Sequence, residues 1–379
     1  MDGKSKWRGR AVLVVLGSSL ALIGSGCGGN PAASAPAADP SASRAPSPMT
    51  SIAPSASAAA TSGVALHGAP GPAPVTLAPM ETFATDFPQG VLIAFDSVWT
   101  ANEFVDTVTR IDPTSGEVTE IKGTPGLGPQ GVAAAGDSIW TSGAGSVDRI
   151  DPATNSVTSH VDAGPAVVSL TSAFGSLWAG GHDGLVRINP ETGSIEERIE
   201  SSSDTELPEN QGCGVSTAVG SLWLSCGSTL DRVDPESGEI LATIEPGGSV
   251  VSAGEDLWLT TGKSPFEVAS PDLAYSSVDR IDPQTNQVVP GSTVQLVQGA
   301  GSGGGLADGH EIWFPTTFGD GPGAGMLYEF DAPTGTVIKA FDISEGKGYG
   351  SNAIAFGFGS LWTASGTANQ VRRFQMPSD

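Results

Sequence analysis

The four histidines are the first residues to consider for catalysis, because imidazole is the side chain that titrates nearest neutral pH. His67 lies in a segment of small residues, while His160 and His310 fall within repeated strand and turn patterns. Only His182, followed by Asp183, falls in a loop of irregular sequence. A general base beside a bound divalent cation is the chemistry that such a loop suggests, although a lone loop histidine is usually solvent-exposed and idle. We therefore keep His182 as the one catalytic candidate and assign no catalytic residue.

Two of the three cysteines flank a predicted hairpin. Cys213 and Cys226 lie symmetrically about a turn at Val219 and Gly220. Strand alternation makes them a non-hydrogen-bonded pair, whose Cα atoms lie about 4.5 Å apart, within disulfide range. Export to an oxidising compartment favours this bond. A metal-binding thiol pair is the alternative, but no histidine or third cysteine lies nearby in the sequence.

The third cysteine, Cys27, follows a predicted secretion signal over residues 1–26. A basic head precedes an apolar stretch over residues 11–23, which is shorter than the ~20 residues of a membrane-spanning helix. The small residues before Cys27 resemble a bacterial lipobox, in which the thiol is acylated, although Gly24 stands where an aliphatic residue is usual. The acyl chains would hold the protein at the outer face of the cell membrane. Ordinary secretion with Cys27 idle is the alternative.

Residues 27–74 are mostly Ala, Ser, Pro and Gly and show no apolar periodicity. Such a segment buries too little surface to offset its ordering entropy, so we expect a flexible tether before a folded domain over residues 75–379.

The formal net charge of −24 argues against nucleic-acid binding, because phosphate contacts need a basic face. Adhesion to anionic lipid through protein charge is disfavoured for the same reason. We interpret the acidic surface as solubilising rather than cation-binding, and assign no cofactor, while a divalent cation stays possible.

Seven short segments repeat along the folded domain. Each has a small or acidic residue, an aliphatic residue and then tryptophan, and the seven tryptophans are Trp99, Trp140, Trp178, Trp223, Trp258, Trp313 and Trp362. A second element of the form aliphatic-x-Arg-Ile-Asp-Pro follows most of them, as in residues 108–113, and leads into an alternating run. Alternation over four to six residues bounded by turns predicts strands, here four per repeat, labelled a to d.

Residues 75–379 divided among seven repeats give about 44 residues each, which matches a four-stranded propeller blade. We therefore predict an all-β protein, a seven-bladed propeller of antiparallel blades. The last repeat supplies only three strands, so we expect residues 74–85 to close its free edge.

The repeated side chains have structural interpretations. Tryptophan at one register of strand b predicts packing between blades, with a ligand-stacking ladder as the alternative. The Asp-Pro pairs predict capped turns rather than a ring of catalytic carboxylates. Each repeated Arg shares a face with the Asp two residues later, so we expect the two to pair within or between blades.

The Gly-x-Leu-Trp turn and the Arg-Ile-Asp-Pro-x-Thr-Gly hairpin resemble the YVTN and streptogramin-lyase (virginiamycin B lyase-like) propeller superfamily, over nearly all of residues 86–375. The resemblance implies the fold, and its lyases use His and Glu with a divalent metal to open a cyclic depsipeptide by elimination. Family lyases commonly begin inner strands with His-Gly, where this chain has Gln89-Gly90 and Gln130-Gly131. We therefore carry over no catalytic residue.

Function is expected on the face formed by the b–c and d–a loops, because these loops are irregular and function sits on variable loops held by a rigid frame. Asp204, Glu206 and Glu209 cluster on one of them. We expect a monomeric, non-catalytic binding or scaffold protein for a protein, glycan or small molecule, with a magnesium-dependent lyase as the alternative. The candidates for binding are Glu103, Phe104, Asp183, Phe266, Phe318, Asp320 and Tyr349.

Overall fold

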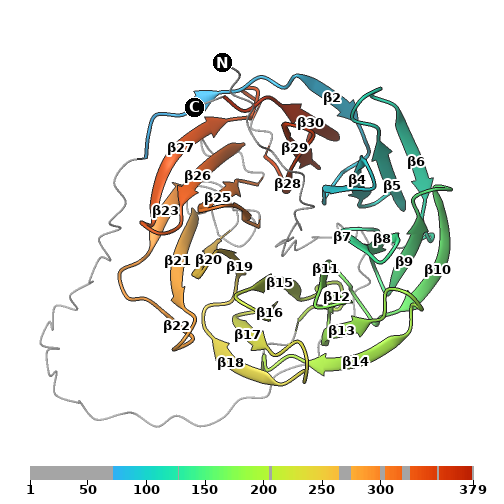
Figure 1. Ribbon diagram of the computed structural model, residues 1–379, viewed down its shortest axis with the longest axis horizontal. Helices are drawn as coiled ribbons and strands as arrows, with labels where there is room; N and C mark the ends of the chain where they lie inside the picture. Colours follow the sequence, from blue (N-terminus) through green and yellow to red (C-terminus); the bar gives the residue numbers. More distant parts are fainter. Residues whose placement is uncertain are drawn as a thin grey trace, which may run out of the picture. The chain divides into compact units, whose positions relative to one another are not determined.

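The computed structural model describes residues 71–126, 128–204, 207–263, 275–298, 304–317, 325–347 and 350–377. In these ranges the chain forms strands and turns, and none of it is a helix that could cross a membrane. The strands build seven sheets around a central axis, so the all-β seven-bladed propeller is confirmed (Figure 1). The predicted signal, nearly all of the tether and Cys27 lie outside the described residues.

Apart from the two N-terminal strands, the strands of each blade run antiparallel in chain order from the axis outward (Figure 1). Blade one comprises β3 (Leu92–Ala94), β4 (Ser97–Asn102), β5 (Thr107–Ile111) and β6 (Val118–Lys122), and blade two comprises β7 (Val132–Ala135), β8 (Ser138–Ser142), β9 (Ser146–Asp151) and β10 (Ser156–Asp162). Blade three comprises β11 (Ser169–Ala173), β12 (Ser176–Gly181), β13 (Gly184–Ile188) and β14 (Ile195–Glu200). Blade four comprises β15 (Gly214–Ala218), β16 (Ser221–Cys226), β17 (Thr229–Val233) and β18 (Ile240–Ile244).

Blades five to seven comprise β19 (Ser249–Ala253), β20 (Asp256–Lys263), β21 (Tyr275–Asp282), β22 (Gln287–Val288) and β23 (Val294–Gln298); β24 (Leu306–Asp308), β25 (Glu311–Pro315), β26 (Met326–Asp331) and β27 (Thr336–Asp342); β28 (Ala353–Gly357), β29 (Ser360–Ser365) and β30 (Gln370–Phe374). In blade five the outer strand is divided, since β22 and β23 both pair with β21.

The second strand of each blade is buried on both faces because it is packed between neighbouring blades. All six residues of β4 are buried, whereas exposure alternates along the outer strand β10. The seven repeated tryptophans are between 0 and 7% exposed. Their role in packing between blades is therefore confirmed.

Four of the repeated arginines, Arg110, Arg149, Arg232 and Arg373, join their blade to the next. Arg110 lies 5.1 Å from the centre of the Trp99 ring, and its Nε donates to the Ser97 hydroxyl. Its Nη1 donates to the Pro152 carbonyl of blade two at 2.7 Å. The expected pairing with the Asp two residues later is replaced by this contact, because the guanidinium extends past its own turn to the next blade. Arg232 and Arg373 make the same contacts, to Pro283 and Pro113.

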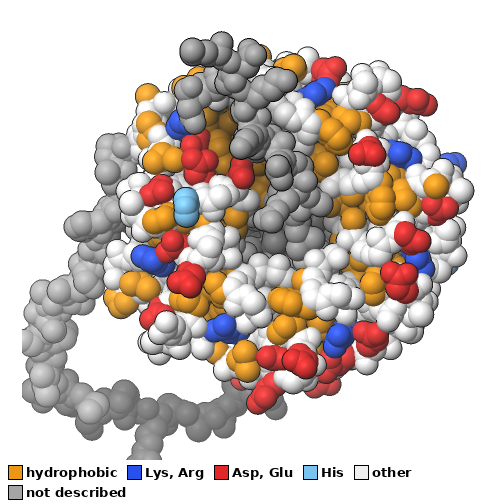
Figure 2. Space-filling view, viewed as in Figure 1, with side chains coloured by type: hydrophobic (Ala, Val, Ile, Leu, Met, Phe, Trp, Pro, Cys, Tyr) orange, Lys and Arg blue, Asp and Glu red, His pale blue; other side chains and the backbone are white. Residues whose placement is uncertain are grey.

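The Asp-Pro turns are capped as predicted. The Asp112 carboxylate accepts from the backbone amides of Thr114 and Ser115, both at 2.8 Å. These hydrogen bonds lower the pKa of Asp112, and the bond from the Ser115 amide has the larger effect. Figure 2 shows acidic side chains around the rim of the visible face, with basic ones between them, as expected of a solubilising surface.

The N-terminal segment closes the ring. β2 (Glu81–Ala84) pairs antiparallel with β30 and becomes the outer strand of blade seven, as predicted. Phe83 packs against Trp362, with ring centres 5.7 Å apart. β1 (Val75–Thr76) pairs parallel with β27 of blade six, which the sequence pattern did not indicate.

Candidate functional site

The loop face is the end of the propeller at which each second strand turns into the third and each blade leads into the next. Of the residues predicted on this face, the structure describes the catalytic candidate His182 and the binding candidates Glu103, Phe104 and Asp183. The other predicted residues of this face lie outside the described ranges: Phe266, Phe318, Asp320 and Tyr349.

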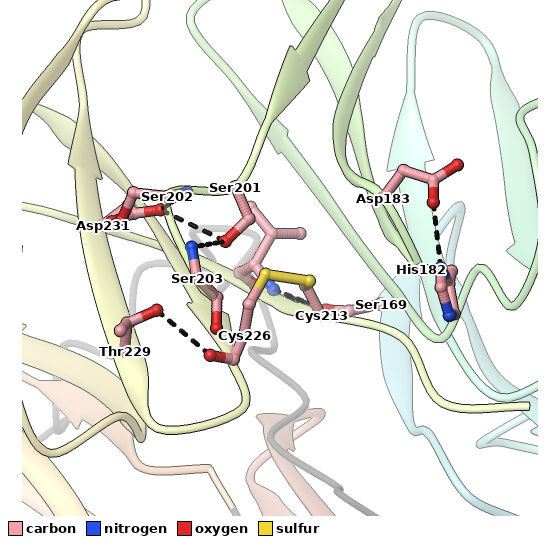
Figure 3. The surroundings of a disulfide bond; sticks show 11 residues. Ser169, His182, Asp183, Ser201, Ser202, Ser203, Cys213, Cys226, Thr229 and Asp231 are labelled. Atoms are coloured by element: carbon pink, nitrogen blue, oxygen red, sulfur yellow. Dashed lines mark hydrogen bonds and ion pairs between the residues drawn. A yellow bond between two sulfur atoms is a disulfide. The ribbon is translucent and has the colours of Figure 1, made fainter. Parts of the chain in front are cut away.

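His182 lies beside Asp183 (Figure 3) and also contacts Leu207 in a second loop. Its Nδ1 lies 2.9 Å from Asp183 Oδ1, and its Nε2 lies 3.1 Å from the Leu207 carbonyl oxygen. An ionised carboxylate and a carbonyl can only accept, so both ring nitrogens carry protons in this arrangement. Both hydrogen bonds raise the pKa of His182, and the bond to Asp183 has the larger effect. Both ring nitrogens therefore face hydrogen-bond acceptors, and neither can act as a general base while these contacts are kept.

The predicted disulfide is present beside this loop (Figure 3). Cys213 and Cys226 are bonded with their Cα atoms 4.6 Å apart, and both are buried. The register Ala218↔Ser221 confirms the two-residue turn on which the prediction depended. The bond fixes the start of the inner strand of blade four to the end of its second strand.

A buried network of amides and one carboxylate joins three blades on the loop face. Gln89 donates to Glu103 Oε2 at 2.5 Å, and Gln130 donates to Glu103 Oε1 at 2.8 Å. Asn352 of blade seven donates in turn to the Gln89 amide oxygen. We call Gln89, Glu103, Gln130 and Asn352 the amide–carboxylate network.

The backbone around the network is fixed by a second carboxylate. Glu103 lies in the loop between β4 and β5, and Asp106 in the same loop accepts from the backbone amides of Gly126 and Gly128 at 2.7 and 2.9 Å. That contact positions the segment that leads to Gln130. The β4–β5 loop that carries Glu103 therefore also anchors the segment before Gln130, the residue that meets Glu103 across the blade boundary.

Glu103 is 2% exposed. Burial raises the pKa of its carboxyl group, and the hydrogen bonds from Gln89 and Gln130 oppose that rise. Among the described residues, its partners are neutral amides and no basic side chain pairs with it. A buried carboxylate without a cationic partner is a feature of functional sites.

An aromatic pair flanks the network. Phe104 follows Glu103, Phe87 precedes Gln89 by two residues, and their ring centres lie 4.7 Å apart, edge to face. Both residues have left-handed backbones, with φ of 51° for Phe87 and 71° for Phe104. The Phe104 side chain is nevertheless 53% exposed.

The three amide residues of the network share one position in the repeat, at which the sequence analysis named Gln89 and Gln130 but not Asn352. Gln89, Gln130 and Asn352 each stand ten residues before the repeated tryptophan of their blade. In blades three, four and five the equivalent residues are Val168, Cys213 and Gly248. Alignment of the repeats on tryptophan would have shown polar amides in three consecutive blades.

No protein-family model and no curated protein sequence matches the chain, but solved structures do. Virginiamycin B lyase from Staphylococcus aureus superposes with a TM-score of 0.61 at 15% identity, over 78% of this chain and 99% of the lyase. The chain shares the fold of virginiamycin B lyase. A streptogramin B lyase gives a TM-score of 0.58 at 16% identity, over 78% of this chain and 97% of its own. BamB from Moraxella catarrhalis gives 0.51 at 13% identity, over 78% of this chain and 84% of BamB.

The arrangement on the loop face is suited to hydrogen bonding. In the described ranges, no three His, Cys, Asp or Glu side chains are grouped closely enough to hold a metal ion. The buried network instead contains amide groups and one carboxylate, which are groups that can donate and accept hydrogen bonds.

Proposed function

We propose that the protein is an exported, lipid-anchored and monomeric propeller that binds a ligand through its loop face. The proposal for its location depends on the signal-like residues 1–26 and on Cys27 as the acylated residue. The proposal for binding depends on one observation, the amide–carboxylate network with its exposed neighbour Phe104. Glutamine and asparagine hydrogen-bond a ligand but do not exchange protons near neutral pH, so they favour recognition over catalysis.

The alternative is a lyase like its structural neighbours. A virginiamycin B lyase bound to quinupristin was made catalytically inactive by replacing one histidine with alanine. In this chain the histidine of the loop face, His182, donates from both ring nitrogens to fixed acceptors. We therefore expect no opening of a streptogramin B depsipeptide by the purified protein with added Mg²⁺. Ring opening that disappears in His182→Ala would favour the lyase.

Binding at the loop face can be tested by photo-crosslinking inside the cell. Phe104 and Phe95 are both exposed phenylalanines of blade one, and they lie at opposite ends of β4. Replacing either with benzoylphenylalanine gives a matched pair of probes on the two faces. The mass of the purified, irradiated protein then reports a covalent adduct with a protein, a glycan or a small molecule.

We expect an adduct at position 104 and none at position 95. Adducts only at position 95, or equal adducts at both, would show that the loop face is not the binding surface. Absence of any adduct at position 104 would also count against the proposal.

A further inference from the structure

The amide–carboxylate network has a direction that the charge of Glu103 imposes. An ionised carboxylate only accepts, so the NH₂ groups of Gln89 and Gln130 must point toward it. The oxygen of Gln89 therefore faces away and accepts from the NH₂ group of Asn352. The oxygen of Asn352 is the last acceptor in this series.

That last acceptor is buried and unpaired. Asn352 is 2% exposed, and its Oδ1 has no hydrogen-bond partner in the described structure. Leaving a buried acceptor without a donor is unfavourable, and so is leaving a buried carboxylate without a cation. The Asn352 oxygen needs a hydrogen-bond donor and the Glu103 carboxylate needs a positive charge, and an ammonium group supplies both.

The aromatic pair indicates what else that partner contains. Phe104 directly follows Glu103 and exposes half of its side chain, while Phe87 supports it from the side. Aromatic rings beside a carboxylate attract organic cations, both through the ring face and through apolar contact. A hydrated inorganic ion gains little from an exposed phenylalanine, and divalent cations are usually held by more than one carboxylate.

We propose that the network binds the protonated primary amine of a ligand with an apolar or aromatic body. The ammonium group donates to Glu103 and to the free oxygen of Asn352, and the body of the ligand lies against Phe104. This proposal rests on the proposed function, because it specifies the class of ligand for the same face.

The test compares two probes that differ in charge alone. Phenethylamine, which is protonated at pH 7, and 2-phenylethanol have the same aromatic body. Binding of each to the full-length protein is measured by calorimetry or by ligand-observed NMR. We expect the amine to bind at least about tenfold more tightly than the alcohol, as a desolvated charge pair with cation–π contact would give.

Two glutamate variants give the matched control. Glu103→Gln removes the buried charge at nearly constant size, whereas Glu120→Gln removes an exposed charge from β6 of the same blade. We expect Glu103→Gln to lose the preference for the amine and Glu120→Gln to keep it. Circular dichroism of both variants confirms that the fold is retained, and Phe104→Leu, which leaves the carboxylate intact, should weaken amine binding several-fold.

Equal affinity for the amine and the alcohol would overturn the ligand class. Displacement of the amine by Mg²⁺ that depends on Glu103 would overturn it in favour of a metal site. If the crosslinker at position 104 still gives an adduct in either case, binding at the loop face stands and only the ligand class is wrong. If it gives none, the proposed function has failed as well.

Discussion

Replacing Phe83 with alanine should destabilise the ring at the place where it closes. Phe83 is the buried residue of β2, with 8% of its surface exposed, and it packs on Trp362 in a cluster that includes Val98 and Ile111 of blade one. Core Phe→Ala changes cost about 3–5 kcal/mol, and we expect the lower end, about 3 kcal/mol, because β2 is an outer strand. For a domain of about 300 residues, that loss corresponds to a fall in Tm of roughly 5 °C.

Thermal unfolding followed by tryptophan fluorescence measures this loss. Phe174→Ala is the control, because Phe174 is 47% exposed in a turn of blade three, and its loss should lie within about 0.5 kcal/mol of zero. A protein that begins at Thr85 rather than Gly71 should show a larger loss and aggregate, since the edge of β30 is then unpaired. Equal melting temperatures for Phe83→Ala and Phe174→Ala would refute closure by β2.

Three further predictions concern other parts of the chain. Cys27→Ser should move the protein from the detergent phase to the aqueous phase, or leave the signal uncleaved, and unchanged partitioning would contradict lipid attachment. Non-reducing peptide mass spectrometry should find Cys213 joined to Cys226; the closed loop is worth at most about 3 kcal/mol, and less here because the hairpin is already local. His182 should titrate above its ordinary pKa of 6.5, so its stabilising contacts are complete below that pH and lost as pH rises through the folded-state pKa. Loss of the raised pKa in Asp183→Asn, seen by NMR, would confirm the cause, and an unshifted value in the native protein would contradict it.

Most of the fold could be predicted because it is a repeat. The period of the tryptophans gives the number of blades, and the missing fourth strand of the last repeat predicts closure by β2. The disulfide followed from strand alternation and the length of one turn. In each case, local spacing determines the geometry.

The contacts between blades were harder to predict. The repeated arginine could be placed on the correct face, but its partner is a turn carbonyl of the next blade, as for Arg110 and Pro152. The two-residue strand β1 carries no periodicity that marks it as a strand.

The candidate site was predicted only in part: Glu103 and Phe104 were among the binding candidates, whereas the amide side chains that meet Glu103 were missed for a related reason. Asn352 and Gln89 are 263 positions apart in the sequence, and the closing of the ring brings them together. Amides also attract less notice than histidines or cysteines when residues are searched for chemistry. The binding candidates beyond Glu103, Phe104, His182 and Asp183 fall outside the described residues, so they stay predictions.

The pairing of β1 and β2 also determines the order in which the ring should open when its N-terminal segment is pulled. β1 pairs with blade six and β2 with blade seven, so the N-terminal segment spans the boundary between the last two blades. A pull on the chain before residue 75 therefore loads the two residue pairs of β1 first, and reaches β2 and Phe83 only after β1 has separated. We therefore expect β1 to separate from β27 before force reaches the pairing of β2 with β30 that closes the ring. Single-molecule extension from the N-terminus should show a small early rupture before the main unfolding event.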